Sequence, residues 1–502
     1  MTQMAQPHVV STRFRDHPPG LFYLFFAEMW ERFSYYGLRA LLVFYLTAEL
    51  LYSQEAAYGV YATYTALIYT TPIIGGFIAD RILGDRKAIV AGGILIALGH
   101  ISLALPGEWL FFVGLSLIIT GTGLFKANVS ALLGKLYEHG DYRRDAGFTL
   151  FYIGINVGAF LAPLTCGVIG ELYGWHYGFS LAAFGMILGL VFFFRGLPSM
   201  EGHGLPPKGA ILNKPAFLGL NWEQATYMLA FLAVPLSALV IKNHNHFDYI
   251  LPVVGIMVVA YMIYLSLKTE GNERWNILTI LVLMFFFMSF FALFEQAGSS
   301  INFFTKLQVD RHILGYEIPA SAFQSLNPMF VILLGPFIAQ LWIRMGAAKR
   351  EPNAPVKFFI GLLGAALGFV VLAFCTRFAD MNGLVSPWWI VLVYLIHTVG
   401  EICISPSGLS MVTKLAPARL TGTLMGVWFI SLAYGNYLAG VLSKLSAVDL
   451  NITEGAATLP TYASAFSSVA YIGFGVAILM LIITPFLSSV FNREASMKGY
   501  NE

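Results

Sequence analysis

The chain has 502 residues, of which 58% are hydrophobic and only 11% are charged. Soluble domains are about 25% charged, so this composition excludes an ordinary soluble protein and indicates an integral membrane protein. The formal net charge of +2, without any block of basic residues, gives no sign of nucleic-acid binding.

Fourteen apolar segments are predicted to cross a bilayer as helices, since about 20 helical residues span its hydrocarbon core. The first six are predicted at 21–46, 56–79, 87–105, 109–134, 146–170 and 176–194. A polar segment, 196–221, follows, and two additional spans are predicted at 224–241 and 249–267. The last six are predicted at 275–304, 320–343, 355–376, 387–411, 422–443 and 462–488.

This order predicts an all-α protein with three regions. Residues 1–195 form an amino-terminal six-helix bundle, 196–273 a cytoplasmic linker with two additional helices, and 274–502 a carboxy-terminal six-helix bundle. Two such bundles around a site at the bilayer midplane are the layout of alternating-access carriers.

The distribution of positive charge predicts the orientation. An even number of spans places both termini on the same side, and that side holds 21 of the 29 lysines and arginines. The other side holds only Lys242, Lys306, Arg311, Arg377 and Lys444. Because cytoplasmic loops carry the excess of positive charge, both termini are expected to be cytoplasmic.

Charged residues inside the first predicted span point most directly to function. With about 100° of rotation per residue, one narrow stripe of the helix carries Glu28, Glu31, Arg32, Tyr35 and Arg39. Such a stripe must face protein or a water-filled cavity, because contact with lipid is costly for each charge. The alternative is an ion-pair network that only fixes helix packing, but ionisable groups within membranes favour the functional interpretation.

The stretch 28–37, Glu-Met-Trp-Glu-Arg-Phe-Ser-Tyr-Tyr-Gly, resembles the Glu-x-x-Glu-Arg-Phe-x-Tyr-Tyr-Gly signature of the proton-dependent oligopeptide transporters. That family is a branch of the major facilitator superfamily. The resemblance implies a major facilitator fold with two extra helices between its six-helix bundles, as in bacterial members, and fourteen transmembrane helices. It also implies import of peptides together with protons.

A second stretch, 76–87, resembles the loop between the second and third helices that recurs across this superfamily. Its charges lie at a predicted cytoplasmic corner, where they can pair with a neighbouring helix end in one state and release it in another. Asp80 and Arg81 are therefore candidate gating residues. The alternative is a positively charged loop that only sets the topology.

Three more charges stand alone within apolar spans: Lys126 in 109–134, Glu295 in 275–304 and Glu401 in 387–411. An ammonium group at that depth requires a carboxylate or an anionic substrate. Lys126 shares the amino-terminal bundle with Arg32 and Arg39, whereas Glu295 and Glu401 lie in the carboxy-terminal bundle. A cavity between the bundles would be positive on one wall and negative on the other, which suits a zwitterion such as a short peptide or an amino acid.

Carried over position by position, the resemblance implies individual roles. Arg39 and Lys126 match residues that receive the peptide carboxylate, and Glu401 matches the residue that receives the amino group. Asn156 and Asn327 match amides that bond the peptide backbone. The residues that match a loosely fitting side-chain pocket are Tyr35, Tyr36, Tyr69, Tyr152, Trp428 and Ser431. The alternative for these last residues is packing or anchoring at the membrane interface.

The candidate proton-coupling residues are Glu28, Glu31, Arg32 and Glu295. Burial favours the protonated form of a carboxyl group, whereas a neighbouring arginine favours the ionised form. Ionised, Glu295 would hold the two halves together through Arg39; protonated, it would free Arg39 for the substrate carboxylate. Lys126 with Glu401 would close the cytoplasmic side in the absence of substrate, so both are also candidate gating residues. For His397, four residues before Glu401, a hydrogen bond to a neighbouring helix is favoured over a proton relay.

The favoured function is proton-driven import of di- and tripeptides, without a cofactor, by a carrier that works as a monomer in a bacterial plasma membrane. A proton-coupled carrier of nitrate-like or drug-like molecules remains open, although plant nitrate carriers of the family tend to lose the acidic residues that are intact here. A membrane enzyme is disfavoured, since no catalytic or metal-binding pattern is evident. The three cysteines, Cys166, Cys375 and Cys403, lie in apolar runs and predict neither a disulfide framework nor a metal site.

Overall fold

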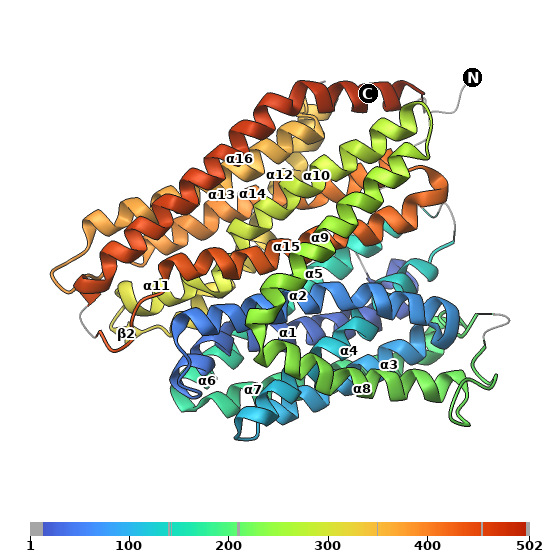
Figure 1. Ribbon diagram of the computed structural model, residues 1–502, viewed down its shortest axis with the longest axis horizontal. Helices are drawn as coiled ribbons and strands as arrows, with labels where there is room; N and C mark the ends of the chain where they lie inside the picture. Colours follow the sequence, from blue (N-terminus) through green and yellow to red (C-terminus); the bar gives the residue numbers. More distant parts are fainter. Residues whose placement is uncertain are drawn as a thin grey trace. The chain divides into compact units, whose positions relative to one another are not determined.

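The computed structural model describes residues 14–138, 141, 143–207, 211–348, 350–452 and 455–497, and most of them are helical (Figure 1). The first helices along the chain are α1 (Gly20–Ala48), α2 (Gln54–Ile78), α3 (Gly84–Leu103), α4 (Glu108–Lys135), α5 (Arg144–Ala162), α6 (Val168–Tyr173) and α7 (Trp175–Gly196). They are followed by α8 (Trp222–Lys242), α9 (His244–Leu267), α10 (Asn272–Phe294), α11 (Ser300–Gln308), α12 (Leu326–Ala347), α13 (Ala354–Cys375), α14 (Trp388–Leu415), α15 (Thr421–Ser443) and α16 (Gly455–Met497).

Each predicted span coincides with one of these helices or with two helices in close succession, so the prediction of an all-α protein is confirmed. Within the described residues, eleven helical segments are long and apolar enough to cross a membrane. Helices α1, α2 and α3 are not among them, and α1 carries two glutamates and two arginines. The number of fourteen spans therefore stays a prediction.

The connection between α2 and α3 differs from the expected loop. It is a π-helical turn, Ala79–Leu83, which continues directly into α3. The bend follows from Gly84, whose φ is +73° and whose missing Cβ leaves room for the backbone of Leu205 and Pro206. Only glycine combines this backbone conformation with such a close approach.

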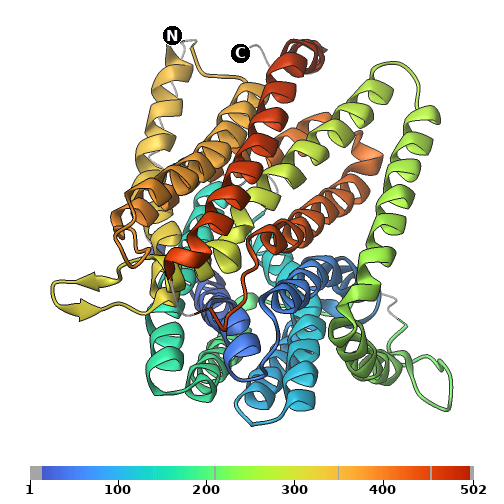
Figure 2. The same ribbon diagram turned by 60° about the vertical axis from the view of Figure 1, so that its left-hand side comes forward.

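The predicted span 275–304 is also interrupted. Helix α10 ends at Phe294, a 3-10 turn covers Glu295–Gly298, and α11 then begins at Ser300. After α11 the chain forms a short hairpin of β1 (His312–Ile313) and β2 (Tyr316–Glu317), which projects from the helices (Figure 2). Leu314 and Gly315 form its two-residue turn with positive φ values of 52° and 84°, as tight hairpins require.

The chain divides into two compact units. Unit 1 contains residues 1–37, 71–162 and 176–236. Its helices α3 and α4 cross at glycines: a Cβ at Gly92 would lie 2.5 Å from the carbonyl oxygen of Gly121, and a Cβ at Gly99 would lie 2.7 Å from that of Gly114. Small residues of this kind allow membrane helices to pack backbone against backbone.

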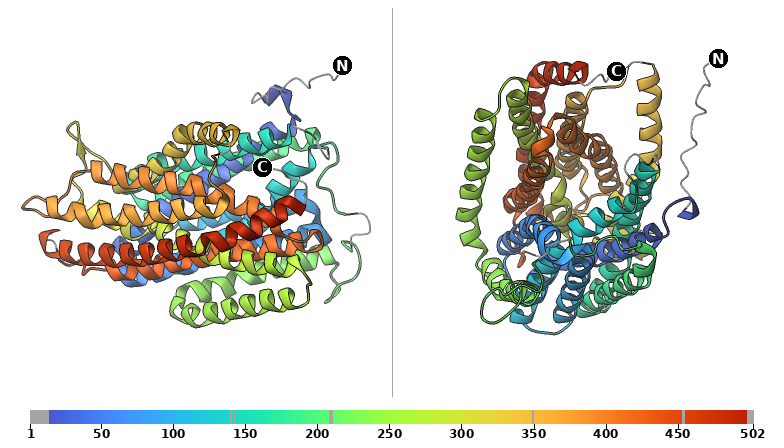
Figure 3. Two further views of the ribbon diagram at one scale, coloured as in Figure 1. Left: turned by 90° about the horizontal axis from the view of Figure 1, so that it is seen from above. Right: turned by 90° about the vertical axis from the view of Figure 1, so that its right-hand side faces the viewer.

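Unit 2 contains residues 38–70, 163–175 and 237–502. Helices α13 and α16 lie side by side along it (Figures 1 and 3), and its apolar core is rich in phenylalanine, including Phe287, Phe290, Phe369 and Phe466. The last part of α1 and the first part of α2 belong to this unit, where Asn302 donates a hydrogen bond to the Ala40 carbonyl. The predicted boundaries of the three regions, at 195/196 and 273/274, stay a prediction.

Candidate functional site

The charges on α1 form two clusters, one in each unit. In unit 1, Arg32 donates two hydrogen bonds to Glu31, with Nε 2.5 Å from Oε2 and Nη2 2.6 Å from Oε1. Glu28 Oε1 lies 3.6 Å from Arg32 Nε, and all three side chains are buried. The other oxygen of Glu28, Oε2, is buried and has no hydrogen-bond partner among the described residues. Both oxygens of Glu31 thus accept hydrogen bonds, whereas one oxygen of Glu28 accepts none among the described residues.

Other predicted residues of unit 1 surround this cluster. The charge of Lys126, on α4, acts on Glu28, and the Arg32 guanidinium lies over the ring of Tyr35 at 4.9 Å from its centre. Tyr36 contacts Tyr35 edge to face. Glu28, Glu31 and Tyr35 of the predicted stripe thus all contact Arg32, whereas its fifth residue, Arg39, lies outside this cluster.

The two predicted residues of α5 lie close together in sequence but differ in burial. Asn156 is buried and donates a hydrogen bond to the Tyr152 carbonyl of its own helix, at 3.0 Å. The Tyr152 side chain is 47% exposed. A side chain with that exposure can contact a ligand or lipid.

The second cluster lies in unit 2 and joins distant parts of the sequence. Arg39 Nη2 lies 2.8 Å from Glu295 Oε2, and both side chains are buried. Arg39 Nε also donates a hydrogen bond to the Tyr61 hydroxyl, at 3.1 Å. A Cβ at Gly298 would lie 2.2 Å from that hydroxyl and 2.9 Å from Arg39 Nε. The glycine therefore allows α1, α2 and the 3-10 turn to meet around one guanidinium.

Glu401, on α14, belongs to the same group. It accepts a hydrogen bond from Asn327 Nδ2 at 2.8 Å, and Asn327 also donates to the Thr398 hydroxyl at 3.0 Å. The charges of Glu295 and Arg39 both act on Glu401. The pair of Arg39 and Glu295, which was expected from the sequence, thus lies in unit 2 together with Glu401 and Asn327.

The remaining aromatic and hydroxyl residues of the predicted pocket are mixed in their surroundings. Trp428 is fully buried against Phe287, with ring centres 4.6 Å apart, and Ser431 donates a hydrogen bond to the Trp428 carbonyl. Tyr69, near the middle of the chain's second helix, is half-buried. Trp428 therefore belongs to the apolar core of unit 2, and its position is compatible both with packing and with lining a site.

The predicted gating residues Asp80 and Arg81 are exposed, and the Arg81 guanidinium lies over the ring of Phe77. The buried carboxylate of this corner is Asp85, whose Oδ2 lies 2.6 Å from Lys135 Nζ. His397 contacts the Ala365 carbonyl of α13 through Nε2 at 3.1 Å, as favoured from the sequence.

Sequence reasoning missed three polar residues of these sites: Tyr61, Asp85 and Tyr394. Tyr394 is buried, and the charge of Arg39 acts on it. Asp85 lies in the stretch 76–87 that resembles the superfamily loop, and its position next to Gly84 could have identified it as a candidate. No comparable signal in the sequence distinguishes the two tyrosines from other aromatic residues of their helices.

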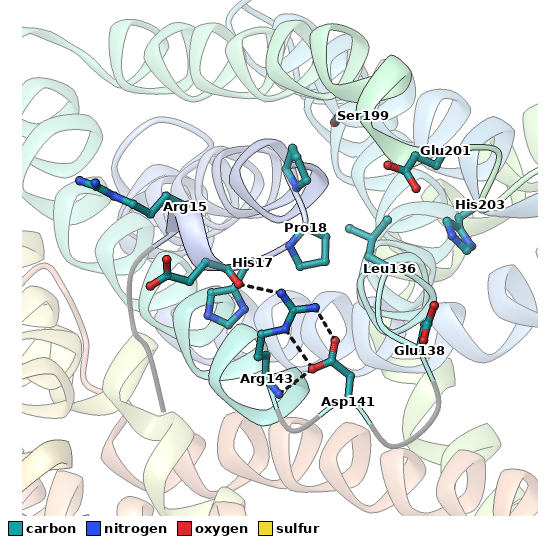
Figure 4. Close-up of a pocket in the computed structure, with 12 residues that line it drawn as sticks. Arg15, His17, Pro18, Leu136, Glu138, Asp141, Arg143, Ser199, Glu201 and His203 are labelled. Atoms are coloured by element: carbon teal, nitrogen blue, oxygen red, sulfur yellow. Dashed lines mark hydrogen bonds and ion pairs between the residues drawn. The ribbon is translucent and has the colours of Figure 1, made fainter. Parts of the chain in front are cut away.

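A polar cavity of about 480 Å³ lies elsewhere in unit 1, and no predicted site residue lines it (Figure 4). Arg143 donates hydrogen bonds to Asp141 and to the Asp16 carbonyl, and His17 Nδ1 lies 2.9 Å from the Tyr137 hydroxyl. Hydrogen bonds from Arg143 hold the pKa of Asp141 below its usual range, and burial raises the pKa of Tyr137 to about 12. These contacts tie the segment before α1 to the segment between α4 and α5.

Comparison with known proteins identifies the family. A sequence model described as "POT family" matches residues 86–459. The chain belongs to the POT family. It is 37% identical to the peptide transporter YePEPT of Yersinia enterocolitica, with 94% of this chain and 95% of that protein covered. It is 34% identical to dipeptide and tripeptide permease B of Salmonella typhimurium, with 96% and 98% covered, and 39% identical to the uncharacterized transporter YclF of Bacillus subtilis, with 86% and 89% covered.

Solved structures of POT-family proteins are similar as well. A mutant of a peptide transporter POT in complex with alafosfalin superposes with a TM-score of 0.83 at 37% identity, covering 95% of this chain and 96% of that one. A POT family transporter in complex with 5-aminolevulinic acid gives a TM-score of 0.80 at 31% identity, with 95% and 98% covered. This likeness confirms the predicted fold class, and the family membership excludes the enzyme alternative.

Proposed function

We propose that this POT-family protein imports di- and tripeptides together with protons by alternating access. The observation that carries the proposal is the buried ion pair between Arg39 and Glu295, with its neighbours Glu401 and Asn327. A buried pair is costly to form, so it is retained where its making and breaking serve a purpose. The names of the relatives, which are peptide transporters and a dipeptide and tripeptide permease, support the choice of substrate.

The ion pair acts as a proton-dependent connection. While Glu295 is ionised, it holds the Arg39 guanidinium and so links α1 to the turn after α10. When Glu295 takes up a proton, Arg39 becomes available to a peptide carboxylate. Arginine suits this exchange because its planar guanidinium binds any carboxylate in a similar geometry.

The peptide's amino group is received by Glu401, which Asn327 orients through its amide N–H. Lys126 provides a second cation for the peptide carboxylate, and Asn156 and Asn327 contact the peptide backbone. The loosely fitting walls for varied side chains are Tyr35, Tyr36, Tyr69, Tyr152, Trp428 and Ser431. Aromatic walls of this kind give apolar contact without requiring one shape.

Glu28 and Glu31 take part in proton transfer beside Arg32. Glu31 is held by two hydrogen bonds, whereas Glu28 Oε2 has none among the described residues. A buried carboxyl oxygen without a donor favours the protonated form, so Glu28 is the better proton acceptor of the two.

The further expectations complete this proposal. Asp80 and Arg81, with Lys126 and Glu401, contribute to gating, the carrier works as a monomer, and it needs only the proton gradient as its energy source. The protein crosses the bacterial plasma membrane many times with both termini in the cytoplasm, and its two six-helix bundles flank the linker and extra helices at 196–273.

The deciding experiment is uptake of labelled dialanine into liposomes that contain the purified protein, with and without an inward proton gradient. Accumulation that needs the gradient and is blocked by excess unlabelled tripeptide would support the proposal. If dialanine moves under neither condition, and does not exchange, peptide transport is excluded and a different small-molecule substrate must be sought.

A further inference from the structure

An apolar groove runs between α3 and α8 in unit 1, and none of the residues predicted for transport lines it. Its volume is about 600 Å³, within the range of small-molecule sites. Helix α3 contributes Lys87, Ala91 and Ile94, and α8 contributes Tyr227 and Phe231. These residues recur at spacings of three, four or seven, so each helix presents one face to the groove.

The groove is charged at one end and apolar along the rest. At the charged end, Lys87 Nζ lies 2.6 Å from Glu223 Oε1, and the Tyr227 hydroxyl donates to the same oxygen at 3.3 Å. Further along, Leu95 joins Ile94, which is 44% exposed, and Phe231, which is 68% exposed. The apolar part therefore suits a hydrocarbon chain rather than a water-soluble ligand.

The charged end of the groove contains a hydrogen-bond donor without an acceptor, on the side chain of Arg86. Its Nε donates to the His203 carbonyl at 2.6 Å, but its Nη2 is buried and has no acceptor among the described residues. Since Lys87 and Glu223 neutralise each other, the guanidinium of Arg86 leaves this end with a net charge of +1. A buried donor of a charged group without a partner is costly, so an acceptor of opposite charge is expected there.

We propose that this groove binds an anionic phospholipid. The phosphate accepts hydrogen bonds from Arg86, and one acyl chain lies along Ile94, Leu95 and Phe231. Phosphatidylglycerol, with its single negative charge, compensates the charge of the site, whereas phosphatidylethanolamine, with no net charge, does not. On the predicted topology this end of α3 is cytoplasmic, where basic pockets between helices bind anionic head groups.

A lipid in this groove would join α8, one of the two extra helices, to α3. Helix α8 is attached to α3 through the half-buried Lys87–Glu223 pair, and ion pairs that water can reach contribute little on their own. A phospholipid between the helices adds apolar contact on both sides and a charge-assisted hydrogen bond. It thereby holds α8 against α3.

The test is native mass spectrometry of the full-length, delipidated protein titrated with phosphatidylglycerol or phosphatidylethanolamine. Arg86→Gln should weaken phosphatidylglycerol binding about five- to tenfold, the effect of one charge-assisted contact near a membrane surface. Ala230→Trp, which fills the groove from α8, should remove the same adduct without altering charge. The matched controls are Arg144→Gln, an exposed arginine outside the groove, and Leu229→Trp, on another face of α8.

Three outcomes would overturn the proposal. One is unchanged phosphatidylglycerol binding in Ala230→Trp, which remains decisive even if Arg86→Gln does not fold. Another is equal binding of the two lipids by the wild-type protein. The third is complete displacement of phosphatidylglycerol by inorganic phosphate, which would show a site for a soluble anion instead of a lipid.

Discussion

The two clusters of buried charge on α1 are built in different ways. Glu28 and Glu31 both contact Arg32 within a single helix of unit 1. Arg39 lies only two turns further along, but its partner Glu295 comes from the other half of the chain. The first cluster is local in sequence, with Glu28 and Arg32 at the i,i+4 spacing of a helix, whereas the second exists only while α1 packs against the turn after α10.

This difference means that the two clusters depend differently on the packing of the helices. The contacts of Glu28 and Glu31 with Arg32 lie within one helix, so they do not require α1 to pack against the turn after α10. A pair between distant segments is made or broken by the packing of those segments, so it can report and control a conformation. We therefore expect substitutions in the two clusters to have different consequences.

The largest effect is expected for Glu295→Gln. Glutamine cannot release or take up a proton, so accumulation of dialanine driven by the proton gradient should fall to the equilibrium level. Counterflow exchange of dialanine should remain, because the site for the peptide is still present. The measurement is uptake and exchange in the same preparation of liposomes.

The matched control for that variant is Glu317→Gln. Glu317 also pairs with an arginine, Arg311, at 2.6 Å, but it is exposed in the β hairpin. Its substitution should leave gradient-driven uptake unchanged. Retained accumulation in Glu295→Gln would refute the role assigned to the long-range pair.

Within the local cluster, Glu28 and Glu31 should respond differently to replacement by glutamine. Glu31→Gln replaces an ionised acceptor of two hydrogen bonds and should destabilise the protein by about 1.5–3 kcal/mol. Glu28→Gln removes no hydrogen bond from Oε2 and should cost less than about 1 kcal/mol, while changing the pH dependence of uptake. Thermal unfolding of both variants checks the first difference, and equal destabilisation would contradict it.

The same contrast explains what could be predicted from the sequence. The positions of the helices and the stripe on α1 depend on local periodicity, and both could be predicted. The pairing of Arg39 with Glu295 could only be suggested from their opposite charges. Partners such as Tyr61 were not found, because a single sequence carries no information about which helices meet.

Irregular backbone was also missed. The interruption at Glu295–Gly298 lies inside a single predicted span, and the π-helical turn Ala79–Leu83 stands where a loop was expected. Only the glycines at 84 and 298 signalled them, and a glycine in a membrane helix more often serves packing. The close approach that Gly298 permits depends on the tertiary structure, so it could not be predicted.

That glycine provides a smaller test of the long-range pair. In Gly298→Ala, the new methyl group would overlap the Tyr61 hydroxyl and press on Arg39, which should destabilise the protein by about 1–3 kcal/mol. Gly475→Ala is the matched control, because nothing lies within 4 Å of its Cβ position and alanine favours a helix. Thermal unfolding that ranks the control below Gly298→Ala would argue against close packing at this turn.

The smallest effect on stability is expected for the ion pair of Arg143 and Asp141, which lies outside the membrane spans. Hydrogen bonds from Arg143 lower the pKa of Asp141 in the folded protein, whereas the unfolded carboxyl has its ordinary pKa of about 4. The pair therefore stabilises the fold above pH 4, and this contribution is lost as the pH falls through the lowered value. Arg143→Gln should reduce the melting temperature slightly at pH 7, and the difference from wild type should shrink as the pH falls below the ordinary carboxyl pKa. A difference that grew on acidification would mean that Arg143 does not stabilise the ionised form of Asp141.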